Sequence, residues 1–167
     1  SIGIGQGYNT FTILQMANAT SIIANRGVMI KPRLFKGSRE FNSSEFTYSK
    51  PVSQGKLNLR EEWFDFVIDA MEEVNKSGTA SRVFGNARYP VAGKTGTAQV
   101  FTIKQDEEYD AEKVPERLKD HSLYIGFAPV DKPEIAVAVV VENGGFGVTT
   151  ATPIAKLVFD FYLAKKR

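Results

Sequence analysis

The sequence predicts an α+β domain in which helices pack on an antiparallel sheet. Two helix-forming segments come first, three strand-forming segments then follow one another, and a last helix ends the pattern. Helices and strands grouped in this way, without regular alternation, are typical of the α+β class. A short turn at 131–133 separates the last two strands, so these two should form an antiparallel hairpin.

The composition is that of an ordinary globular domain. The 167 residues carry a net charge of +2, with 24% charged and 43% apolar side chains, which excludes collagen-like and disordered classes. Because no strong basic stripe is present, nucleic acid is not an expected partner. The absence of cysteine and the single histidine, His121, exclude disulfides and a two-histidine metal centre. The longest apolar run, at 135–141, is far shorter than the ~20 residues that a membrane span needs.

The first predicted helix has clear signals at both ends. It begins after Thr12, which forms a capping box with Gln15, and Gly27 takes the left-handed stop position at its end. The segment 28–35 should be an edge or hairpin strand, and the polar segment 37–56 a loop or a weak hairpin. The apolar stripe of the helix is predicted to consist of Ile13, Met16, Ala17, Ile23 and Ala24.

The second helix has the most regular apolar periodicity. Asn58 is its predicted cap, with Glu61 completing a capping box. The helix should end at Ser77-Gly78, after which Thr79 caps one more short turn to Phe84. Spacings of three and four predict a buried stripe, including both aromatic residues, made of Leu59, Trp63, Phe66, Val67, Ala70, Met71 and Val74.

Three strands and a helix complete the pattern. The strands are predicted at 91–101, 121–129 and 134–141, and the continuous apolar run of the third suggests burial on both faces. The last helix should begin with Thr152 as its cap and Pro153 at its first position. Its predicted buried stripe consists of Ile154, Leu157, Val158 and Phe161.

A Lys-Thr-Gly string lies in the first of these strands. Strand alternation places the Thr95 and Thr97 hydroxyls on one face, where they suit a carboxylate, and Lys94 on the other. Gly96 leaves the lysine face bare, which permits close approach of another element. This string is one of three motifs of serine acyl-transfer enzymes that react with β-lactams. From this segment alone, a solvated lysine on an edge strand is an equal alternative.

Further motifs follow one another along the chain: Gly3–Gly7, Leu14–Ala17, Gly78–Ala80, Gly93–Val100, Glu116–His121, Gly126–Pro129 and Glu142–Gly145. With these motifs in this order, the chain resembles the C-terminal half of a class B penicillin-binding protein, of the elongation type, from Ser1 to about Phe161. We therefore expect residues 1–167 to be the C-terminal portion of a penicillin-binding transpeptidase domain within a longer protein.

The resemblance implies a peptidoglycan D,D-transpeptidase that serves cell-wall cross-linking and cell shape. Such a protein lies at the periplasmic face of the inner membrane, held by an N-terminal anchor that this chain does not include. Its serine attacks the penultimate D-Ala carbonyl of a stem peptide, and β-lactams mimic the D-Ala-D-Ala end. The implied partners are stem peptides, β-lactams and the rest of the transpeptidase domain, and no cofactor or metal is implied.

The resemblance also assigns roles to the strand residues. Lys94 would sustain a positive potential and hydrogen-bond the serine of the family's S-x-N motif. Thr95 and Thr97 would hold the carboxylate, and the backbone N–H of Thr97 would supply half of an oxyanion hole. Gly96 would be structural. The charged segment 102–119 would border the cleft as a mobile lid, or else be a solvated loop.

The remaining motifs of the family are not found. The sole S-x-x-K string, Ser53–Lys56, lies in a polar loop, and no S-x-N string occurs, so we expect no nucleophile in this chain and no activity from the chain alone. His121 should sit at a strand start and is not expected to be a triad base. Two alternatives stay open: a non-catalytic module that binds D-Ala-D-Ala ends or a protein, and an unrelated interaction domain in which Lys94 has no role.

Overall fold

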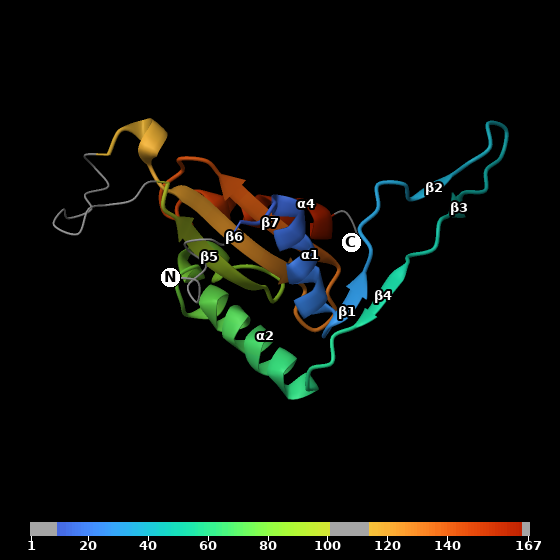
Figure 1. Ribbon diagram of the computed structural model, residues 1–167, viewed down its shortest axis with the longest axis horizontal. Coiled ribbons are helices and arrows are strands. Elements are labelled where there is room, and N and C mark those ends of the chain that lie inside the picture. Colours follow the sequence, from blue (N-terminus) through green and yellow to red (C-terminus); the bar gives the residue numbers. More distant parts are fainter. Residues whose placement is uncertain (1–9, 101–113, 165–167) are drawn as a thin grey trace.

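The computed structural model describes residues 10–100 and 114–164, and its body is built on one antiparallel sheet (Figure 1). The sheet has three strands in the order β5 (Ala92–Ala98), β6 (His121–Ala128) and β7 (Ile135–Val141), each antiparallel to its neighbour. The predicted α+β class and the predicted hairpin of the last two strands are confirmed. Within the described ranges, β5 and β7 are the edges of this sheet.

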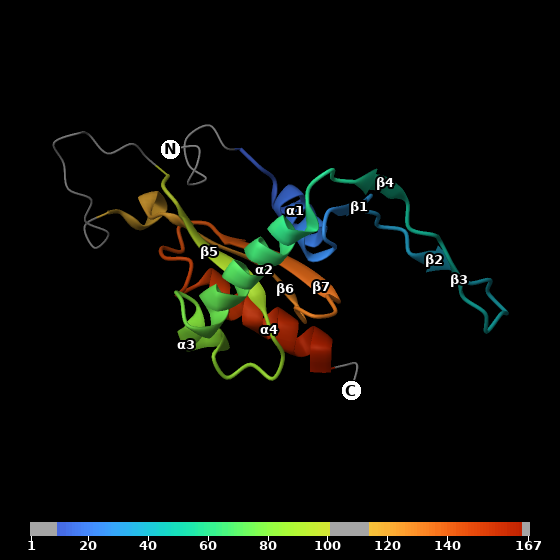
Figure 2. The ribbon, with the colours of Figure 1, turned by 90° about the horizontal axis from the view of Figure 1, so that it is seen from below.

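Helices cover both faces of the sheet (Figure 2). On one face, α1 (Ile13–Ala24) and α2 (Glu61–Lys76) form a core with β5 and β6 that contains Ala24, Phe64, Ile68, Met71, Ala92 and Phe127. On the other face, α3 (Ser81–Phe84) and α4 (Ala151–Ala164) enclose a second core that contains Phe84, Tyr124, Val137, Ala155 and Phe159. The sheet is thus the middle layer of three.

An arm of short strands projects from this body (Figure 1). Its base is the antiparallel pair β1 (Val28–Ile30) and β4 (Ser53–Lys56), and its outer part is the pair β2 (Gly37–Ser38) and β3 (Thr47–Tyr48). The predicted hairpin in the polar segment is therefore confirmed, although its strands are very short. A 3₁₀ turn, Glu116–Leu118, precedes β6.

The ends of α1 are as predicted, and its buried side is predicted in part, since Ala24 is buried and Ile23 packs against the core. Thr12 and Gln15 form both hydrogen bonds of the capping box, at 3.2 and 2.8 Å. Gly27 has a φ of 89° after the helix. The buried residues of the helix are Thr20 and Ala24, whereas Ile13, expected in the stripe, is 50% exposed.

The predicted cap of α2 is wrong, and of its predicted buried stripe only Met71 is buried, with Val74 partly buried. Arg60, not Asn58, precedes the helix and makes no side-chain cap. Trp63 and Phe66, expected in the core, are 48% and 75% exposed. The side that meets the sheet is rotated by about one residue and consists of Phe64, Ile68, Met71 and Asn75. The amphipathic pattern allowed both sides, because the helix has aromatic residues on each.

The predicted buried side of α4 is also wrong. The side that meets the sheet consists of Ala151, Thr152, Ala155 and Phe159. The predicted stripe of Ile154, Leu157, Val158 and Phe161 is 39–69% exposed. Small alanines let the helix backbone approach the sheet closely, which the larger side chains on the other side do not permit. The Thr152 hydroxyl does not cap the helix, because the helix begins at Ala151 and the hydroxyl donates to the Gly147 carbonyl at 2.9 Å.

The strand predictions are closer to the structure. The second and third strands match β6 and β7 to within a residue at each end. β7 is covered on both faces, as expected, but mostly only partly buried: Ile135 and Val139 pack against one core and Ala136 against the other, and Val137 is the most buried residue of the strand. The first strand ends at Ala98, and the expected lid at 102–119 falls mostly on residues 101–113, which lie outside the described residues. The short helical turn that was predicted after the second helix exists as α3, but the residue that precedes it is Ala80 and not Thr79.

Candidate functional site

The structure brings the four predicted strand residues together on β5. Lys94 pairs with Ile125 of β6 and Thr97 pairs with Ser122. Thr95 lies opposite Tyr124, so it shares the face covered by α3 and α4. Lys94 lies two residues from Ala92 and shares the face covered by α1 and α2. The predicted alternation therefore holds, and groups on both faces border the open edge of β5.

The Thr95 hydroxyl has a partner from a different element. Its Oγ1 lies 3.1 Å from the Oγ1 of Thr79, in the connection between α2 and α3. Thr79 was expected only as a helix cap, so its place beside the strand is a finding of the structure. The Gly78–Ala80 string was part of the family pattern, and this was the one signal in the sequence that could have drawn attention to it.

The Thr97 hydroxyl meets the loop between β7 and α4. The backbone N–H of Gly147 donates to Thr97 Oγ1 at 3.4 Å. A Cβ at Gly147 would come 2.3 Å from the Gly96 carbonyl oxygen, so only glycine fits this close approach. Ser122 anchors the loop by donating to the Phe146 carbonyl at 3.0 Å and accepting from the Ala151 N–H at 3.0 Å.

Lys94 is exposed and carries no counterion among the described residues. Its ammonium has one polar partner in that part of the chain, the carbonyl of Thr95, at 2.8 Å. A neutral carbonyl leaves most of the positive charge uncompensated. The Lys94 ammonium is therefore available to bind an anionic or polar ligand at the edge of the strand.

Two other candidate groups from the sequence are engaged in contacts of their own. His121 begins β6 as expected, and its Nδ1 accepts the Asn143 backbone N–H at 3.0 Å, which occupies the nitrogen that a base would need. Ser53 and Lys56 lie on the exposed strand β4, where Lys56 pairs with Glu61 at 2.9 Å. In the described ranges, no cluster of three or more acidic or histidine side chains suits a metal ion, and no helix is long and apolar enough to cross a bilayer.

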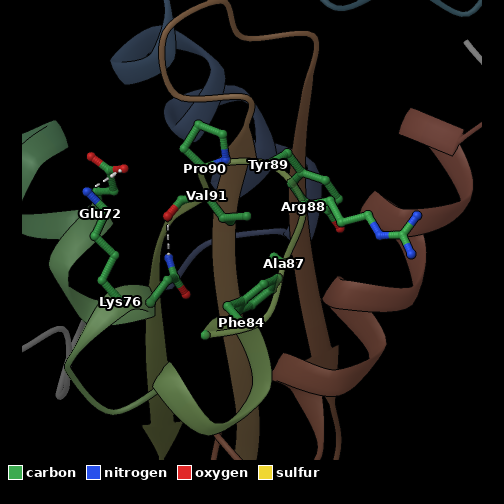
Figure 3. A pocket seen from close by; sticks show the side chains of 10 residues that line it. Glu72, Lys76, Phe84, Ala87, Arg88, Tyr89, Pro90 and Val91 are labelled. Atoms are coloured by element: carbon green, nitrogen blue, oxygen red, sulfur yellow. Dashed lines mark hydrogen bonds and ion pairs between the residues drawn. The ribbon is translucent and has the colours of Figure 1, made fainter. Parts of the chain in front are cut away.

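A cavity of about 420 Å³ lies at the C-terminal end of α2 (Figure 3). Its walls include Glu72 and Lys76, which form an ion pair at 2.9 Å, and Phe84. The hydrogen bond to Glu72 raises the pKa of Lys76. The Arg88 side chain points out of the cavity toward α4. No residue of the Lys94–Thr97 strand lines it, so this cavity is separate from the candidate site.

Comparisons with known proteins agree with this geometry. The sequence profile of the family described as "Penicillin binding protein transpeptidase domain" matches residues 1–160. The peptidoglycan D,D-transpeptidase MrdA of Acinetobacter baumannii is 42% identical over 100% of this chain and 24% of its own length. MrdA of Haemophilus influenzae is 38% identical over 99% of this chain and 26% of its own length.

Solved structures show the same fold. The crystal structure of Pseudomonas aeruginosa PBP2 in complex with WCK 5153 has a TM-score of 0.75 and 36% identity, and the match covers 97% of this chain and 32% of that one. Penicillin-binding protein A from M. tuberculosis, as its imipenem acyl-enzyme complex, has a TM-score of 0.74 and 26% identity, over 96% of this chain and 32% of that one. The chain thus spans about a quarter of the curated relatives and about a third of these structures.

Proposed function

Because the chain belongs to the penicillin-binding protein transpeptidase domain family, we propose that it is the C-terminal part of the transpeptidase domain of a peptidoglycan D,D-transpeptidase. In this proposal, the chain supplies the Lys-Thr-Gly strand that binds the substrate. The S-x-x-K and S-x-N motifs, and with them the catalytic serine, belong to a part of the protein outside these residues. The whole protein works at the periplasmic face of the inner membrane, held by an N-terminal anchor outside this chain.

The observation that carries the proposal is the arrangement of Lys94, Thr95 and Thr97 at an open strand edge. An edge strand offers unpaired backbone N–H and C=O groups to an extended peptide, which is a general mode of peptide recognition. The two hydroxyls lie on one face of this edge and suit the terminal carboxylate of a D-Ala-D-Ala stem peptide or the carboxylate of a β-lactam. Gly96 between them keeps the strand free of a side chain.

Lys94 acts on the serine side of the site. Its exposed ammonium, bound only to a neighbouring carbonyl in the described part of the chain, is free to hydrogen-bond the serine of the S-x-N motif. The serine nucleophile attacks the penultimate D-Ala carbonyl, and the terminal D-Ala leaves with a proton. The backbone N–H of Thr97 stabilises the negative charge that develops on the carbonyl oxygen. An amine of a second stem peptide then takes the acyl group.

The test is the acylation of the complete protein by benzylpenicillin. Lys94→Ala should lower the second-order rate of acylation by about 10²-fold or more, the size expected when one contact to the reacting centre is lost. Lys132→Ala removes the same charge from the exposed turn between β6 and β7 and should leave the rate unchanged. Equal rates for Lys94→Ala and the wild type would refute this role of the strand.

A further inference from the structure

The hydroxyl of Thr95 can serve a ligand only if its single hydrogen is not already used. Thr95 Oγ1 and Thr79 Oγ1 lie 3.1 Å apart, and either can be the donor of this hydrogen bond. A hydroxyl has one hydrogen and two lone pairs, so one member of the pair donates and the other accepts. If Thr95 donated to Thr79, it would have no hydrogen left for a carboxylate, which only accepts.

Thr97 shows how the second hydroxyl of the strand avoids this conflict. The Gly147 N–H can only donate, so Thr97 Oγ1 is the acceptor in their contact at 3.4 Å. The hydroxyl hydrogen of Thr97 therefore stays available to a ligand. Each of the two strand hydroxyls is thus in contact with one polar group from outside the sheet: Thr79 Oγ1 at Thr95 and the Gly147 N–H at Thr97. Only at Thr97 is the direction of the hydrogen bond certain, because an N–H cannot accept.

We propose that Thr79 is a positioning residue of the substrate site, whose hydroxyl donates to Thr95 and so directs the Thr95 hydrogen toward the carboxylate of the ligand. This inference rests on the proposed function, and it adds to the Lys-Thr-Gly strand a residue from the α2–α3 connection. The bound carboxylate selects this direction of the hydrogen bond, because an acceptor-only group stabilises the arrangement in which both strand hydroxyls donate.

The backbone around Thr79 holds it in place for this role. The Gly78 N–H donates to the Glu73 carbonyl at 2.9 Å, and the Ala80 N–H donates to the Val74 carbonyl at 3.0 Å. A Cβ at Gly78 would lie 2.9 Å from the Val74 Cα, and Ala80 is fully buried. Thr79 therefore lies between two residues whose positions are fixed, one by the end of α2 and the other by the core. The entropy lost on ordering its hydroxyl when a ligand binds should be small for this reason.

The experiment compares Thr79→Val with Thr79→Ser in the complete protein. Valine keeps the shape of threonine without the hydroxyl, and serine keeps the hydroxyl. The readout is the second-order rate of acylation by benzylpenicillin and by its methyl ester, in which the carboxylate is masked. We expect Thr79→Val to slow benzylpenicillin about 2- to 10-fold, the range of a hydrogen bond between neutral groups, and to leave the ester rate unchanged. Thr79→Ser should restore the benzylpenicillin rate.

Different results would overturn different claims. A Thr79→Val protein that reacts as fast as wild type, or that slows equally with both compounds, would overturn the role of Thr79. If thermal melting shows that this variant is unfolded, Thr79→Ala replaces it. This variant should likewise slow the reaction with benzylpenicillin but not the reaction with its methyl ester. A wild-type protein that forms no acyl adduct would instead refute the proposed function. A wild type that reacts and loses activity in Lys94→Ala, but not in Thr79→Val, would leave the proposed function standing and remove only this inference.

Discussion

At Gly93, the residue before the lysine of the site, the strand has no room for a side chain. A Cβ there would lie 2.1 Å from the Tyr124 hydroxyl oxygen. That hydroxyl donates to Asn75 Oδ1 at 3.0 Å, and Asn75 Nδ2 donates to the Val91 carbonyl at 2.9 Å. Burial raises the pKa of Tyr124, so the phenol stays protonated as a donor. Glycine at this position thus lets a tyrosine cross β5 and tie β6 to α2, which fixes the start of the strand that carries Lys94.

A second tyrosine gives a pH-dependent prediction. The Tyr89 hydroxyl donates to Asp160 at 2.5 Å, and Lys156 donates to the same carboxylate at 2.6 Å. Burial acts to raise the pKa of Asp160, but these hydrogen bonds outweigh it and hold the pKa below its usual 3.8. Asp160 therefore contributes stability above its unfolded pKa, and this contribution is lost as the pH falls through the lower folded value. Tyr89→Phe should destabilise the chain more near neutral pH than at about pH 3.

The measurement for Tyr89→Phe is the free energy of unfolding by urea across this pH range. Tyr48→Phe is the matched control, since Tyr48 is exposed on the arm and makes no hydroxyl hydrogen bond among the described residues. Its unfolding free energy should follow the wild type at every pH. A Tyr89→Phe effect of constant size across the range would show that the hydroxyl acts through packing or burial rather than through the ionised carboxylate.

Among the elements, strands were predicted from sequence more accurately than the faces of helices. The three strands of the sheet follow one another, and each is recognised by local β-forming residues and turn signals, such as those at 131–133. A helix face is decided by what packs against it. In α4, large apolar residues lie on one side and alanines with Phe159 on the other, and hydrophobicity alone favoured the wrong side. The side of α4 that faces the sheet is determined by the close packing of its small residues against the strands, and this packing cannot be predicted from the local sequence pattern.

The orientation of α4 can be tested with one substitution on each side. Phe159 is fully buried and Leu157 is 69% exposed. Phe159→Ala should lower the free energy of unfolding by about 3–5 kcal/mol, because it opens a cavity between α4 and the sheet. Leu157→Ala should change it by about 0.5 kcal/mol or less, as is usual for exposed positions. Urea unfolding of both variants gives the comparison, and a larger effect at Leu157 would mean that the opposite side of α4 is buried.

At the scale of the molecule, the candidate site is assembled from three separate parts of the fold. The strand with Lys94 was predictable, because the motif is contiguous and strand alternation follows from the sequence. Thr79 and Gly147 were not, since they reach β5 from the α2–α3 connection and the β7–α4 loop through tertiary packing alone. Under the proposed function, two hydroxyls, an ammonium and an open strand edge would bind and orient the peptide, and the nucleophile would come from residues outside this chain.

The 167-residue chain alone should therefore form no acyl adduct with benzylpenicillin. Its one S-x-x-K string lies on exposed β4, where Lys56 is paired with Glu61 at 2.9 Å and Ser53 Oγ accepts the Gly55 N–H at 3.2 Å. A nucleophilic serine needs an adjacent base and a site that binds the acyl group, and β4 supplies neither. Intact-mass analysis after incubation should show the unmodified chain, while the complete protein gains one penicillin.

The same chain should bind a D-Ala-D-Ala peptide no more tightly than about millimolar, because one strand edge offers few of the contacts of a closed site. Titration followed at the amides of β5 by nuclear magnetic resonance measures this. Tighter, saturable binding without acylation would favour a non-catalytic module that recognises D-Ala-D-Ala ends. A stoichiometric adduct on the chain would instead place a nucleophile within these residues and contradict the assignment of the serine to another part of the protein.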